Sequence, residues 1–70
     1  MTAEEWVRTF AERAGAEPPS QDLIDEILRL ASVAAHSSER RAAPIACWIA
    51  GTTGRPVSEL RAVAEELEAG

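Results

Sequence analysis

Four residues near the middle of the chain have side chains that could do chemistry. His36 is the only histidine and Cys47 the only cysteine, and Arg40 and Arg41 lie between them. A cysteine nucleophile needs a base, a group that orients the base, and donors for an oxyanion. The chain has no second histidine and no asparagine to fill those roles. The sequence therefore predicts no catalytic residue.

Metal and cofactor motifs are also missing from the sequence. A structural zinc site needs four ligands of the cysteine or histidine type, and the chain has one of each. It has no glycine-rich phosphate loop, no paired-cysteine motif, no HExxH motif and no calcium-loop spacing. We therefore expect no metal site and no cofactor.

One arrangement could bind an anion or a partner: His36, Glu39, Arg40 and Arg41, followed by a helix expected to begin at Pro44. Free N–H groups and the dipole at a helix N-terminus favour negative charge, and the arginines would add to this. A structural role is the alternative, because the arginines could bond the last carbonyls of the preceding helix or pair with Glu39. The residues alone leave both open. These five residues are the candidate ligand-binding or partner-binding residues.

The pattern of caps and apolar residues predicts an all-α fold. Thr2 and Ser20 are good N-caps, Gly15 is a good left-handed stop, and Pro44 suits a first helical position. Apolar residues recur at helical spacing after each start signal. We expect a single domain over residues 1–70, a small four-helix bundle with helices at about 3–14, 21–36, 44–53 and 57–68.

The third of these helices is expected to be the central one, because it is apolar nearly all the way round. It has a bulky side and a side of small residues. The bulky side consists of Ile45, Trp48, Ile49 and Thr52, and the small side of Ala46, Cys47, Ala50 and Gly51. We interpret Cys47 as a buried small apolar residue, and Trp6 of the first helix as part of the core.

Composition narrows the classes of function. Seven basic residues, all arginine, against twelve acidic ones give a net charge of −5, which argues against nucleic-acid binding. The sequence shows no signal peptide, and no apolar run approaches the roughly 20 residues of a membrane span. With a free cysteine, we expect a cytoplasmic protein. A chain this short buries only about 60% of its unfolded surface, so self-association would help to stabilise it.

The central segment resembles a known family. Leu30–His36, Glu39–Arg40, Ala42–Pro44 and Gly51 are similar to a small uncharacterised helical domain of high-GC bacteria. Its typical pattern is Val-Ala-His, two residues, Glu-Arg-Pro, Ala-Ala-Pro, leucine and two threonines. Members of that family occur alone, or joined or adjacent to proteins resembling the molybdenum cofactor guanylyltransferase, which attaches GMP to molybdopterin.

The resemblance implies a role beside molybdenum-cofactor chemistry. Its hallmark residues here are His36, Glu39, Arg40, Ala43 and Pro44, whereas Arg41 replaces a proline and Ala46–Cys47 replace two threonines. The first expectation is a non-catalytic accessory domain in molybdopterin guanine dinucleotide synthesis, which binds an anionic ligand or a guanylyltransferase-like partner. The second is a structural domain that forms a homodimer and has no ligand.

Overall fold

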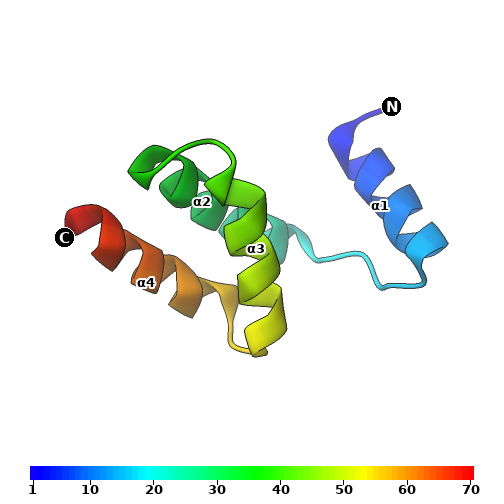
Figure 1. Ribbon diagram of the computed structural model, residues 1–70. Helices are drawn as coiled ribbons and strands as arrows, with labels where there is room; N and C mark the ends of the chain where they lie inside the picture. Colours follow the sequence, from blue (N-terminus) through cyan, green and yellow to red (C-terminus); the bar gives the residue numbers. More distant parts are fainter.

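The computed structural model describes all 70 residues and contains four helices and no strand (Figure 1). Their bounds are Ala3–Ala14 (α1), Gln21–Ser37 (α2), Ala42–Thr53 (α3) and Val57–Ala69 (α4). The all-α four-helix class is confirmed, and every predicted helix end lies within two residues of the observed one. None of the four helices is long and apolar enough to span a bilayer.

The predicted caps at the start of the chain are present. The Thr2 hydroxyl accepts a hydrogen bond from the Glu5 N–H at 3.1 Å, and the Ser20 hydroxyl accepts one from the Leu23 N–H at 3.2 Å. Gly15 has a φ of 78°, which lets the next N–H turn back to the carbonyl of Ala11 at 2.8 Å. Side-chain and glycine caps of this kind fix helix ends locally, which is why the sequence predicted them well.

The central helix is α2, not α3 as the sequence suggested. Helix α2 packs against both α3 and α4, while α3 and α4 contact each other only slightly (Figure 1). Leu30 of α2, 3% exposed, is the most deeply buried residue. The prediction failed because α3 is apolar all round yet turns only its small side inward, whereas α2 has 17 residues and a broad apolar arc.

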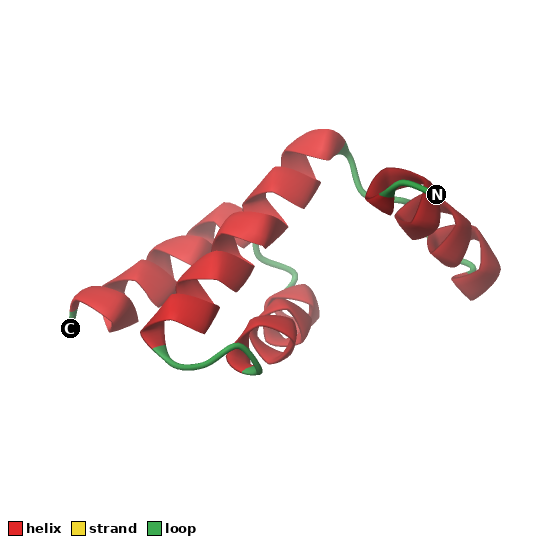
Figure 2. Cartoon of the chain, turned by 90° about the horizontal axis from the view of Figure 1, so that it is seen from above, coloured by secondary structure: helices red, strands yellow, loops and turns green.

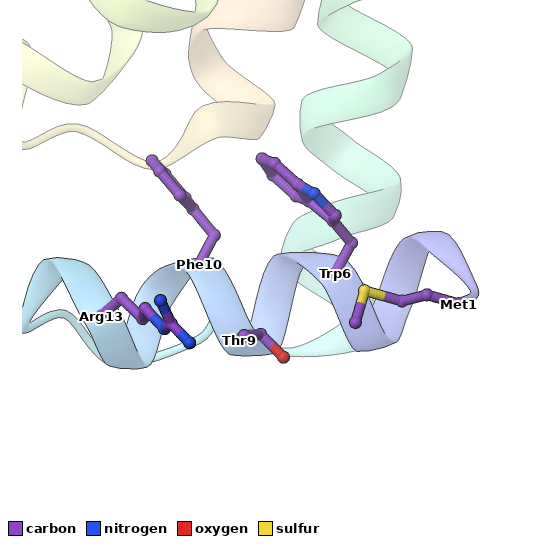
Figure 3. Close-up of a pocket in the computed structure, with 5 residues that line it drawn as sticks. All are labelled: Met1, Trp6, Thr9, Phe10 and Arg13. Carbon is purple, nitrogen blue, oxygen red and sulfur yellow. The ribbon is translucent and has the colours of Figure 1, made fainter.

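Helix α1 stands apart from the other three in both views (Figures 1 and 2), and none of its Cα atoms lies within 8 Å of a Cα atom in another helix. The connection contains Pro18 and Pro19, which restrict the chain to extended conformations. Trp6 is therefore 56% exposed, so its assignment to the core was wrong. It stacks on Phe10 instead, with ring centroids 5.1 Å apart (Figure 3).

An ion-pair cluster joins α2 to α4. Arg61 Nε lies 2.8 Å from the Glu26 carboxylate, and Arg61 Nη1 lies 3.2 Å from Glu65. Arg29 reaches the same Glu26 carboxylate at 3.5 Å. The hydrogen bond from Arg61 is the main cause that lowers the pKa of Glu26. The same pair raises the pKa of Arg61. Glu26 and Arg61 are 35 residues apart, so no local pattern could reveal their pairing.

We expect Glu26 to make the fold acid-sensitive. Because its pKa is lower in the folded chain, the unfolded chain binds the proton first as the pH falls. Stability from this pair is therefore present above about pH 4.3, the ordinary glutamate value, and is lost as the pH drops through the folded pKa. Urea unfolding of wild type and Glu26→Gln at pH 7 and in acid measures the effect, and the gap between them should shrink in acid.

Glu66→Gln is the matched control, since Glu66 on the same bundle has no ion pair. Its difference from wild type should be small at both pH values. A Glu26→Gln gap that stays constant with pH would contradict a depressed pKa at Glu26.

Candidate functional site

The turn that leads into α3 holds the residues predicted to bind an anion or a partner. Helix α3 begins at Ala42, which makes Pro44 its third residue and corrects the expectation that it is the first. The N–H groups of Ala42 and Ala43 donate to the carbonyls of Glu39 and Arg40 at 2.9 and 3.2 Å. Pro44 has no N–H. The N–H groups of Ala42 and Ala43 are therefore already engaged, and an anion at this turn would depend mainly on side chains.

The charged side chains of the turn are arranged in different ways. Arg41 pairs with Glu39 through Nη2 at 3.0 Å and Nε at 3.3 Å. This is the pairing with Glu39 that the sequence left open as a structural role. Arg40 is exposed and has no carboxylate within 4.0 Å. His36 Nδ1 lies 3.3 Å from the Ser32 hydroxyl, on the exposed surface of α2.

A shallow hollow of about 630 Å³ lies beside this turn. Its lining consists of Ser38, Glu39, Arg41, Ala42, Ile45, Ala46 and Ile49. The structure thus brings two of the five predicted site residues, Glu39 and Arg41, to one hollow with an apolar wall from α3. His36, Arg40 and Pro44 are not part of that lining.

The apolar wall continues over the outer side of α3. Ile45, Trp48 and Ile49 are 60%, 72% and 51% exposed, and we call these three residues the α3 apolar face. Ala46 and Cys47 are half-buried, and Ala50 is 4% exposed. The predicted small side faces inward through Ala46, Cys47 and Ala50, but Gly51 is exposed, and the sequence did not show that the bulky side would face solvent. Contiguous exposed apolar surface of this kind commonly marks an interaction site.

Cys47 is half-buried, with Sγ 3.9 Å from the carbonyl oxygen of Ile27. Burial raises the pKa of the Cys47 thiol, so it stays protonated near neutral pH and is a weak nucleophile. No group of three histidine, cysteine, aspartate or glutamate side chains lies close enough together to hold a metal ion.

Fold and site together define a small helical domain with an exposed apolar face and a polar turn at one end. The chain belongs to the family "Domain of unknown function (DUF6457)", which matches residues 1–69. No curated protein and no solved structure shows significant similarity to the chain. The family description states no activity, so the expected links to high-GC bacteria and to molybdenum-cofactor proteins remain predictions.

Proposed function

We propose that the chain is a non-catalytic interaction domain that binds another protein through the α3 apolar face and the adjoining hollow. The observation that carries the proposal is the row of Ile45, Trp48 and Ile49, all more than half exposed on one helix. Tryptophan is among the residues that contribute most to binding free energy when a partner covers it. Glu39 and Arg41 at the edge of the hollow would supply the polar rim that such interfaces have.

The partner that the resemblance favours is a molybdenum cofactor guanylyltransferase-like protein. In this proposal the domain is an accessory of molybdopterin guanine dinucleotide synthesis in bacteria. Arg40, exposed and without an ion pair, would meet an acidic group of the partner or a phosphate of its nucleotide. The support for this step is the sequence resemblance and the unpaired charge, and it carries less weight than the apolar face.

The experiment measures binding of wild type, Trp48→Ala and Arg40→Ala to an immobilised guanylyltransferase-like protein. Loss of a central tryptophan should weaken binding about 30-fold, whereas loss of an exposed charge should change it only a few-fold, mainly in the association rate. Leu28→Ala is the control, because Leu28 is 62% exposed on α2 and belongs neither to the α3 apolar face nor to the hollow.

Titration of GTP against wild type and Arg40→Ala tests the anionic-ligand form of the proposal. Binding to wild type that is weakened in Arg40→Ala would support a phosphate contact at the turn, and equal or absent binding would remove it. If Trp48→Ala bound the immobilised protein as tightly as wild type, the α3 apolar face would not be the docking surface.

A further inference from the structure

We propose that, when no other protein is bound, the α3 apolar face is covered by α1 of a second copy of the chain. The contact is reciprocal: α1 of each copy lies on α3 of the other. The contact surface consists of Trp6 and Phe10 of α1 with Met1 just before the helix, and we call these three residues the α1 aromatic face. The inference rests on the proposed function only in that both use the α3 apolar face.

The surface area of the chain supports a second copy. A compact monomer of 7.5 kDa should expose about 4,250 Å². The observed surface is 5,375 Å², which is about 1,100 Å² more. A stable interface of ordinary size covers about 800 Å² on each partner. The excess surface of one chain is thus of the size that a dimer interface would remove.

The α1 aromatic face is suited to cover the α3 apolar face. Met1, Trp6 and Phe10 are 84%, 56% and 59% exposed, and the two rings are already stacked nearly parallel, at 14° (Figure 3). Ordered aromatic side chains lose little conformational entropy on binding. The α3 helix from Ala42 to Thr53 has no charged residue, so covering it removes no charge from water.

The stiff connection between α1 and α2 favours a second copy over the chain's own α3. Pro18 and Pro19 hold this segment extended, and α1 lies away from α3 in both views (Figures 1 and 2). Val7, on α1, lines a hollow of about 200 Å³ together with Pro19 and Ile24. The α1 aromatic face therefore has no partner within its own chain. Exchange of a terminal helix between two copies is a common route to a symmetric dimer.

Cross-linking of two different single-cysteine chains tests the arrangement. Both chains carry Cys47→Ser, one also carries Arg13→Cys beside the α1 aromatic face and the other Thr52→Cys beside the α3 apolar face, and the two differ in an affinity tag. With a short bis-maleimide, we expect the mixed chain pair to cross-link more than either chain with itself. Preferential self-linking of the Arg13→Cys chain or of the Thr52→Cys chain would mean that like helices pair, and would overturn the reciprocal contact.

A chain that carries both new cysteines distinguishes contact with a second copy from contact with the chain's own α3. The expected product on a denaturing gel is a dimer, and a monomer with an internal link would overturn the proposal. In sedimentation at micromolar concentration, wild type should be dimeric, Phe10→Ala about 30-fold weaker in self-association, and Leu67→Ala unchanged. A wild type that is monomeric throughout would also overturn it.

Each copy has a net charge of −5, so added salt should strengthen the dimer by screening the repulsion between copies. An interface built on ion pairs would show the opposite salt dependence.

Phe10→Ala also distinguishes the two proposals, because it leaves the α3 apolar face intact. It should weaken the dimer about 30-fold and still bind the guanylyltransferase-like protein as tightly as wild type does. A dimer without such binding would leave this inference standing and remove the proposed function.

Discussion

Leu30→Ala is expected to remove roughly half of the chain's free energy of unfolding at 25 °C. Leu30 is 3% exposed on α2, the helix against which both α3 and α4 pack. Shortening a buried leucine to alanine costs about 2–5 kcal/mol, because the cavity that remains refills only in part. A domain of 70 residues has only about 4–10 kcal/mol of stability in total. Urea unfolding followed by far-UV circular dichroism gives the loss directly.

Leu28→Ala is the matched control for this prediction. Leu28 lies on the same helix, two residues away, but it is 62% exposed. The same substitution there removes few contacts, so its effect should stay within about 0.5 kcal/mol. Similar losses at the two positions would mean that α2 does not separate a buried from an exposed side as the structure shows.

The sequence predicted the helix ends that are determined by local interactions. The caps at Thr2 and Ser20 and the stop at Gly15 depend on residues within one helical turn of each other, and all three are present. The start of α3 was placed two residues late, because Pro44 also fits a third position, where the intrahelical N–H bond is still not required. The tertiary pairing of Glu26 with Arg61 was missed, since it joins different helices.

The sequence did not predict which apolar side of a helix faces inward. Periodicity shows that Trp6 lies on an apolar stripe and that α3 is apolar on both sides, but it does not say what each side meets. The structure leaves both Trp6 and Trp48 exposed, although Trp6 had been assigned to the core. Helix α3 has no charged residue on either side, so the sequence alone could not distinguish its buried side from its exposed side.

The structure brings two of the five residues of the predicted site to one hollow, and whether they bind anything remains a prediction. Glu39 and Arg41 line the hollow at the start of α3, as a site at the entrance of that helix would require. The amides that were to assist them are used by the turn, and a tight turn between helices is set by backbone hydrogen bonds that residue types alone do not specify. Whether His36 and Arg40 contact a ligand or partner remains a prediction.

Ala50→Leu is expected to separate α3 from α2. Ala50 is 4% exposed on the small side of α3, where Cys47 also lies close to Ile27 of α2. Three added carbons have no space there, and overpacking of this kind costs about 1–3 kcal/mol. The loss should appear as a lower urea midpoint with an unchanged slope, measured at one protein concentration because self-association shifts apparent stability.

Gly51→Ala, one residue away, is expected to raise the stability of the chain and so provides the contrast to Ala50→Leu. A Cβ atom added at Gly51 would meet no heavy atom within 4 Å, and the residue is exposed inside a regular helix. Replacing a helical glycine with alanine gains about 0.5–1 kcal/mol when the space is free. The two substitutions, one residue apart, should therefore move the urea midpoint in opposite directions. Destabilisation by both would mean that α2 covers Gly51 as well, and that the small side of α3 is wider than the structure indicates.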